Sequence, residues 1–162
     1  MNLPDDLEPQ LRERLIGDRH WQRRLDRRRK PASYHLAVFV EPYLELLLAG
    51  EKTIESRFSA RPVAPYRKVS AGDVVLVKKA AGRIVAVFEV GDVWSFDVVP
   101  GTVDAIRERF ADGLCAQPGL WAKAATAHFA TLMSVDRIRR ILPLAIPKRD
   151  RRGWVVMRPT PV

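Results

Sequence analysis

Cysteine and histidine, the residues that supply many metal ligands and catalytic groups, are scarce in this 162-residue chain. The single cysteine, Cys115, excludes an internal disulfide and a cysteine-cluster metal site. The three histidines, His20, His35 and His128, are scattered and give no evident acid–base pair. No glycine-rich phosphate loop is present either. We therefore expect no metal and no cofactor, and a reducing cytoplasm fits the cysteine usage.

Long hydrophobic runs are also missing. No apolar run approaches the roughly 18 residues that a membrane-spanning helix needs. The N-terminus is charged throughout and lacks the apolar segment of a signal peptide. We therefore predict no membrane association. Hydrophobic residues make up 47% of the chain, which predicts a folded protein, and the length fits one domain with its own core.

Acidic residues are scarce in the C-terminal segment, and both ends of the chain carry an excess of positive charge. The net charge is +9, from 28 basic and 19 acidic residues. Residues 1–33 have 9 basic and 6 acidic side chains, residues 34–136 have 11 and 12, and residues 137–162 have 8 and 1. A neutral body with a basic C-terminal segment favours a polyanionic partner. The alternative is a general compositional bias toward arginine.

The first 33 residues are predicted to form a basic N-terminal helical extension. Apolar residues recur at helical spacing within residues 5–29, namely Leu7, Leu11, Leu15, Ile16, Trp21 and Leu25. Arginines occupy the other faces, and Pro31 ends the pattern. We expect the apolar stripe to pack against the body of the protein. A docking site for a protein partner is the other interpretation of this helix.

The remaining residues, 34–162, read as one α+β domain. The expected strands span residues 34–40, 52–58, 74–79, 83–96, 133–144 and 153–158, and the expected helices span residues 42–49, 103–114 and 118–132. A bend is expected at Gly91. Short connections such as residues 80–82 indicate mostly antiparallel pairing. A small mixed or antiparallel β-barrel with flanking helices fits this order.

The stretch GEKTIESRF, residues 50–58, carries more charge than an ordinary half-buried strand needs. Side chains alternate along a strand, so Thr53, Glu55 and Arg57 share one face, with the last two about 7 Å apart. Lys52 follows Gly50 and can turn toward the same face. Such a cluster can bind a phosphate or the edge of a base. The alternative is a structural lattice of ion pairs at the rim of a barrel.

Taken together, these residues resemble the ASCH domain family of the PUA-like β-barrel superfamily. That family has a Gly-x-Lys-x-x-Glu-x-Arg motif after its first helix, matched here by Gly50, Lys52, Glu55 and Arg57. The Gly72–Asp73 pair before the next strand and the late His128–Phe129 pair also fit. The resemblance covers roughly residues 34–158 and leaves the N-terminal helix unexplained.

The resemblance implies a cleft lined by lysine, glutamate and arginine that binds RNA or modified nucleosides. Some family members resemble amidohydrolases of acylated cytidine, and others are ribonucleases. In the amidohydrolases a threonine stands where this chain has Glu55, and its hydroxyl group is therefore missing here. The resemblance thus supports a catalytic role for Lys52 only weakly. Those enzymes use a further acidic residue from the segment after the long strand, and Asp112 is the only acidic residue near the corresponding place here. Binding of RNA or another single-stranded nucleic acid is therefore the leading hypothesis, with hydrolysis of acylated nucleosides or RNA as the alternative.

Further residues outside the motif are candidates for ligand binding. Tyr43 precedes the motif by one helix, and only one of Lys78 and Lys79 can face a ligand. Trp94 and Phe96 share a strand face and can stack a base, or belong to the core. A basic loop before the last strand can grip phosphates or be a solvated charge run; its arginines are Arg149, Arg151 and Arg152. His128 is predicted to be a partly buried packing residue on a helix.

Overall fold

The computed structural model describes residues 1–26, 33–147 and 151–157. Within them the chain forms helices α1 (Leu7–Arg14), α2 (Arg19–Arg24), α3 (Tyr43–Leu48), α4 (Thr102–Leu114) and α5 (Pro118–Ala125). The strands are β1 (Tyr34–Phe39), β2 (Ile54–Ser59), β3 (Val74–Lys79), β4 (Ile84–Asp97), β5 (Phe129–Leu144) and β6 (Trp154–Met157). The predicted α+β class is confirmed.

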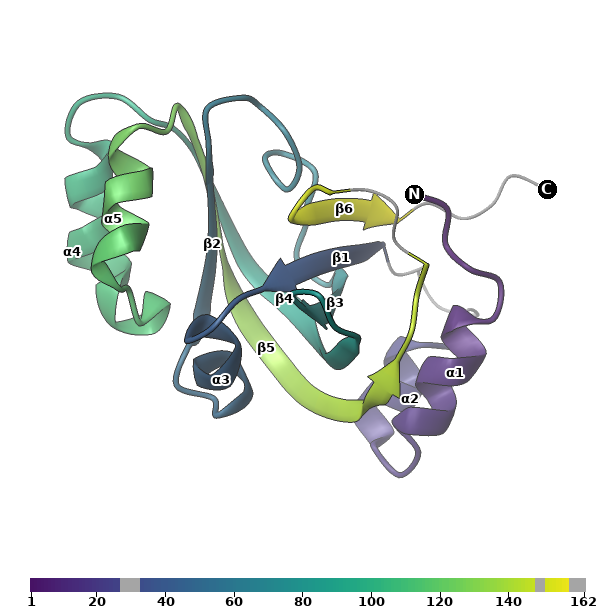
Figure 1. The fold of residues 1–162 in the computed structure, drawn as a ribbon. Helices are drawn as coiled ribbons and strands as arrows, with labels where there is room; N and C mark the ends of the chain where they lie inside the picture. Colours follow the sequence, from purple (N-terminus) through teal and green to yellow (C-terminus); the bar gives the residue numbers. More distant parts are fainter. Residues whose placement is uncertain (27–32, 148–150, 158–162) are drawn as a thin grey trace.

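All six strands belong to one sheet in the order β2-β5-β4-β3-β1-β6. Among the described strands only β1 and β3 pair in parallel, and the other neighbours are antiparallel. The long strands β4 and β5 curl the sheet into a half-barrel (Figure 1). The curl brings the edge strand β2 opposite the other edge of the sheet, where β1 and β6 lie. We call the open gap between these two edges the seam.

Irregular positions in β4 and β5 produce this curl. The register between the two strands shifts around Val90, Gly91 and Val93, which confirms the expected bend. A Cβ atom at Gly91 would lie 2.2 Å from Ser134 Oγ, so a larger residue there would force the side chains of Ser134 and Asp136 to move. Arg137 adopts a left-handed backbone conformation in β5, and its carbonyl oxygen accepts a hydrogen bond from Trp21 Nε1 at 3.1 Å. Bulges of this kind increase the twist and bend of a strand.

The N-terminal segment is two helices, and the expectation of one helix over residues 5–29 is wrong. Gly17, with φ of 84°, turns the chain between α1 and α2, and Asp18 starts α2 by accepting hydrogen bonds from the backbone of His20 and Trp21. Five residues of the predicted apolar stripe are buried against one side of the sheet, as expected; they are Leu7, Leu11, Leu15, Trp21 and Leu25. The sixth, Ile16, is exposed. The predicted domain boundary at residue 33 stays a prediction.

One buried contact shows how closely α1 joins the sheet. The hydroxyl group of Tyr34 in β1 donates a hydrogen bond to Glu8 Oε1 in α1 at 3.0 Å. Burial, together with the charge of Glu8, raises the pKa of Tyr34. The tyrosine therefore stays protonated as the donor of this bond across the physiological range.

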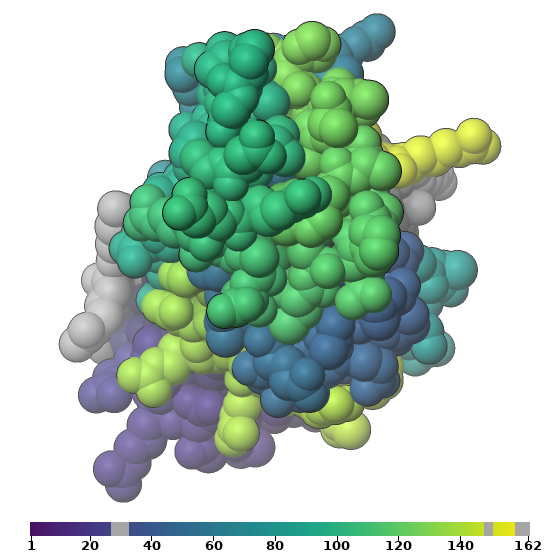
Figure 2. Space-filling model, turned by 90° about the vertical axis from the view of Figure 1, so that its left-hand side faces the viewer, coloured from purple at the N-terminus to yellow at the C-terminus, as the bar shows by residue number. Residues whose placement is uncertain are grey.

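The expected helix over residues 118–132 is too long. α5 ends at Ala125, and the chain enters β5 at Phe129. His128 lies between them and is exposed, so its prediction as a partly buried helical residue is wrong. The reason is tertiary, because Phe129–Ser134 pairs with β2, and this pairing overrides the helical pattern. Helices α4 and α5 cover this end of the molecule, with α3 below them (Figure 2).

No helix in the described residues is both long and apolar enough to cross a membrane.

Candidate functional site

A cavity of about 340 Å³ opens at the seam of the half-barrel. Its walls come from the end of β1 and the following turn, from α3, from β2 and from the start of α5. The lining residues are Val38, Phe39, Val40, Pro42, Tyr43, Lys52, Glu55, Ser56, Arg57, Phe58, Gln117, Gly119, Leu120 and Lys123. The fold thus brings the motif residues Lys52, Glu55 and Arg57 into one cleft, as the sequence pattern predicts.

Lys52 and Glu55 form the buried floor of this cleft. Their side chains are 2% and 6% exposed, and Lys52 Nζ lies 3.6 Å from Glu55 Oε2. Lys52 Nζ also donates hydrogen bonds to the carbonyl oxygens of Ile54 at 2.8 Å and Leu114 at 3.0 Å. A lysine surrounded by a carboxylate and two carbonyl oxygens is an ammonium donor. This geometry favours an electrostatic role for Lys52 over that of a nucleophile, which needs a free lone pair.

Arg57 crosses the seam. Its Nε donates to Glu55 Oε1 at 2.9 Å, its Nη2 to the carbonyl of Val38 at 3.0 Å, and its Nη1 to the carbonyl of Gly153 at 3.3 Å. The guanidinium carbon lies 5.2 Å from the ring centroids of both Phe39 and Trp154. These contacts use three of the five N–H groups of the side chain. Within the described part of the chain, two N–H groups are left for a ligand.

A buried chain of hydrogen bonds holds Trp154, whose ring packs against the guanidinium group of Arg57. Trp154 Nε1 donates to His35 Nδ1 at 3.1 Å, and His35 Nε2 lies 2.9 Å from Asp73 Oδ2. Because Nδ1 accepts, Nε2 must carry the proton and donate to Asp73. The carboxylate also accepts from the backbone N–H of Ser70 at 2.8 Å. Trp154 is thereby held in one orientation beneath Arg57.

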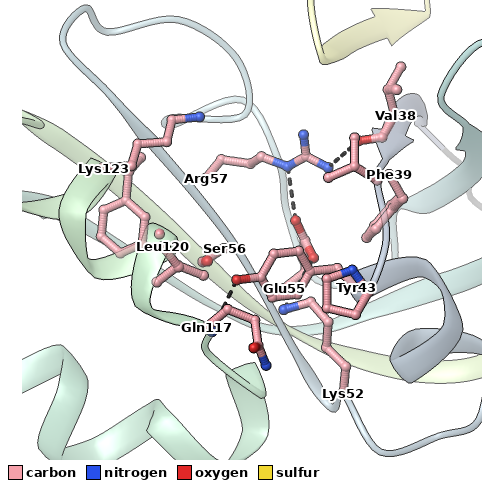
Figure 3. A pocket seen from close by; sticks show the side chains of 14 residues that line it. Val38, Phe39, Tyr43, Lys52, Glu55, Ser56, Arg57, Gln117, Leu120 and Lys123 are labelled. Atoms are coloured by element: carbon pink, nitrogen blue, oxygen red, sulfur yellow. Dashed lines mark hydrogen bonds and ion pairs between the residues drawn. The ribbon is translucent and has the colours of Figure 1, made fainter.

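The mouth of the cleft combines aromatic, amide and cationic groups. Tyr43 from α3 places its ring 5.1 Å from Lys52 Nζ, and its hydroxyl oxygen accepts a hydrogen bond from the backbone N–H of Gln117 at 3.2 Å. Figure 3 shows Lys123 reaching over the cleft from α5, on the same side as the guanidinium group of Arg57 and across from Gln117. The mouth therefore offers an apolar wall on one side and positive charge on the other.

Apart from the basic loop, three predicted site residues lie outside the lining of this cleft. Thr53 is exposed just before β2, and Lys78 is half-buried with its Nζ donating to the carbonyl of Lys79. Trp94 pairs with Leu132 while Arg57 pairs with Thr131, so Trp94 points to the opposite face of the sheet. There its ring packs 4.8 Å from that of Phe110 in α4.

The predicted basic loop is described only in part. Arg149 lies outside the described residues. Arg151 and Arg152 are exposed and directly precede Gly153, whose carbonyl oxygen accepts from Arg57. The loop thus leads to the seam, and phosphate binding by its arginines stays a prediction.

Sequence reasoning missed the cleft residues that α5 contributes, Gln117, Leu120 and Lys123. Pro118 correctly predicted the start of a helix, but no local pattern relates that helix to β2. Phe39, at the end of β1, reads as an ordinary core residue. In the described residues no group of three or more histidine, cysteine or acidic side chains is placed to hold a metal ion.

Comparison with known proteins gives a family match for the part of the chain that supplies most of this cleft. The model of the ASCH domain matches residues 38–112. The crystal structure of an ASCH protein from Zymomonas mobilis superposes with a TM-score of 0.61 at 11% identity, covering 77% of this chain and 87% of that one. A tyrosine-to-phenylalanine variant of that protein gives 0.60 at 11% identity, with 77% and 90% covered.

A second fold neighbour is a protein from Enterococcus faecalis V583 that is assigned to the family model DUF984. It superposes with a TM-score of 0.51 at 11% identity, covering 80% of this chain and 95% of that one. No curated protein matches the sequence significantly. The fold and the predicted family resemblance are confirmed, and identities this low show nothing finer than the fold.

Proposed function

We propose that the seam cleft binds a nucleotide of single-stranded RNA. Residues 38–112 match the model of the ASCH domain, a PUA-like fold family proposed for RNA binding, which supports this proposal. The observation that carries this proposal is a buried carboxylate between two cations at the floor of an open cleft with apolar walls. A charged floor inside an apolar cleft suits a ligand that is flat and apolar on its faces and polar at its edge. A nucleobase has this character.

Each part of a nucleotide has a suitable counterpart in the cleft. The rings of Tyr43 and Phe39 offer surfaces on which a base can stack. Glu55 keeps acceptor capacity beyond its contacts with Lys52 and Arg57, and can accept from an exocyclic amine. Arg57 and Lys123 supply the positive charge for a phosphate group.

Hydrolysis by the same cleft is the second candidate function. The arrangement around Lys52 argues against its use as a nucleophile, since its Nζ donates to two carbonyl oxygens. We therefore place binding first. Cleavage of RNA or of an acylated nucleoside that is lost in Glu55→Gln, with the fold intact, would establish an enzyme instead.

The binding proposal is tested with a fluorescein-labelled RNA of about ten nucleotides and random sequence, a length typical of single-strand binding sites. Fluorescence anisotropy at about 50 mM and about 200 mM KCl should show affinity that falls steeply with salt. Lys123→Ala should lower the slope of log K against log salt by about 0.7, and Tyr43→Ala should weaken binding at both salt concentrations.

The matched control is Lys79→Ala, which removes an exposed lysine at the end of β3, outside the cleft lining. It should leave the affinity within about twofold of wild type if binding is local to the cleft. Absence of binding at low salt, or equal losses in Lys79→Ala and Lys123→Ala, would overturn the proposal.

A further inference from the structure

A second, smaller compartment of about 180 Å³ lies on the other side of Arg57. It is enclosed by the loop after β2, by β5 and by the start of β6, and it shares Arg57, Phe58 and Lys123 with the larger cleft. Arg57 and Lys123 are the two cations that line both compartments. The two compartments therefore adjoin each other at these two positively charged side chains.

The floor of the smaller compartment contains an unsatisfied polar group. Thr131 is 0% exposed, and its hydroxyl has no hydrogen-bond partner among the residues that the structure describes. It lies opposite Arg57 in the β2–β5 ladder, so both side chains stand on the cleft face of the sheet. Buried hydroxyl groups almost always have a partner. The unpaired hydroxyl of Thr131 indicates a partner that the described residues do not supply.

Hydrogen bonds hold two aromatic walls of this compartment in place. The hydroxyl group of Tyr66 donates to Asp97 Oδ1, a bond that raises the pKa of the tyrosine, and its ring lies 4.9 Å from that of Phe129. Trp154 forms another wall and is fixed by His35. Gly153 also lines the compartment, and the exposed Arg151 and Arg152 directly precede it in the sequence. The small volume, the anchored aromatic walls and one buried hydroxyl without a partner suit a small ring with hydroxyl groups better than a second base.

We infer that this compartment is a ribose subsite, in which Thr131 pairs with a sugar hydroxyl of the nucleotide adjoining the one in the larger cleft. This inference rests on the proposed function. The phosphodiester that joins the two nucleotides lies at Arg57 and Lys123, which border both compartments. Both hydroxyl groups can donate and accept, so they form a matched pair. The 2′-hydroxyl group distinguishes RNA from DNA, and Thr131 is thereby a specificity-determining residue for RNA.

The inference is tested by competition against the labelled RNA described above. The competitors are ribonucleoside monophosphates, ribodinucleoside monophosphates with each of the four bases, and the same dinucleotides with a 2′-deoxy sugar at either position. For wild type, the ribodinucleotide should bind about three- to tenfold more tightly than the version that is deoxy at the subsite position. Thr131→Val, which removes the hydroxyl but keeps the shape, should abolish this difference and leave mononucleotide affinity unchanged.

A stability measurement provides an independent readout. Because the hydroxyl of Thr131 is unpaired in the free protein, Thr131→Val should raise Tm by about 2 °C. The comparison variant is Thr126→Val, an exposed threonine outside both compartments whose hydroxyl donates to the carbonyl of Lys123 at 3.2 Å; because that hydroxyl is paired, the variant should not raise Tm, and it should leave the sugar preference unchanged. A lower Tm for Thr131→Val would show that the hydroxyl is already satisfied and would overturn the inference.

The two proposals fail in different ways. If mononucleotides bind and Tyr43→Ala weakens them, but ribose and deoxyribose dinucleotides bind equally, the ribose subsite is wrong and the proposed function stands. If neither mononucleotides nor dinucleotides compete with the RNA and the RNA itself does not bind, the proposed function is wrong as well. A sugar preference that survives in Thr131→Val would assign the discrimination to another residue and would also contradict the inference.

Discussion

Glu55 contacts a cation on each of its two carboxylate oxygens, although its side chain is almost fully buried. Exposed ion pairs contribute little to stability, because water solvates the separated charges nearly as well. A buried charge that loses its partner has no such alternative. The trio of Lys52, Glu55 and Arg57 therefore has a structural role beside its proposed role in ligand binding, and mutations within it must be interpreted together with their effect on the fold.

At the scale of single residues, we expect Lys52→Met to lower the free energy of unfolding by about 3 kcal/mol, since it leaves the carboxylate of Glu55 with Arg57 alone. The double variant Lys52→Met/Glu55→Gln should recover at least about 1 kcal/mol, because it removes the uncompensated charge. Urea unfolding at 25 °C followed by tryptophan fluorescence measures both. A single-variant loss below about 0.5 kcal/mol would instead indicate a solvated surface pair.

At the scale of elements, the N-cap side chain of α2 makes capping hydrogen bonds, whereas that of α1 does not. Asp18 accepts hydrogen bonds from the backbone N–H groups of His20 and Trp21, and its Oδ2 lies 3.0 Å from Arg139 Nε in β5. The pKa of Asp18 is held below its ordinary value mainly by the hydrogen bond from the backbone N–H of Trp21, and the charge of Arg139 lowers it further. Asp6 occupies the same position in α1 but makes no such capping bond.

We predict that Asp18→Ala lowers the free energy of unfolding by about 1 kcal/mol at pH 7, and that Asp6→Ala changes it much less. Because the pKa of Asp18 is lower in the folded state, its contribution is full above the ordinary value of 3.8 and is lost as the pH falls through the folded-state pKa. The difference between wild type and Asp18→Ala should therefore shrink below about pH 4. Urea titrations at several pH values measure this, and a difference that does not change with pH would refute it.

At the scale of the whole molecule, α1 and α2 share one apolar core with the sheet. Leu11 is 0% exposed and packs in the cluster that contains Leu36, Leu76 and Val87 from the strands. Trp21 is buried in the same cluster and donates to the carbonyl of Arg137. A segment packed in this way unfolds together with the rest, because its removal would expose one side of the sheet to water.

We expect Leu11→Ala to lower the stability of the entire protein by about 3 kcal/mol in a single transition. Ile16→Ala removes an apolar side chain of the same helical region that is 83% exposed, and should stay within about 0.5 kcal/mol of wild type. Far-ultraviolet circular dichroism and tryptophan fluorescence should give coincident urea midpoints. Two separate transitions would show that the N-terminal helices form an independent unit.

The sequence alone predicted much of this protein because many signals were local. Alternation in GEKTIESRF put Glu55 and Arg57 on one face, the position of Gly50 allowed Lys52 to join them, and Gly91 marked the bend in β4. The boundaries that failed depend on distant contacts. Gly17 and Asp18 divide the N-terminal helix, and pairing with β2 turns Phe129 and its neighbours into strand.

Sequence determined the motif, its chemistry and the family resemblance; tertiary structure decided burial, the seam and its partners. Whether Glu55 was solvated or enclosed depended on how β4 and β5 curl the sheet, which brings Arg57 to the carbonyls of Val38 and Gly153. The contribution of α5 and the unpaired hydroxyl of Thr131 depended on the same curl. Local periodicity fixes the face on which a side chain lies, but only the packed chain fixes what it meets there.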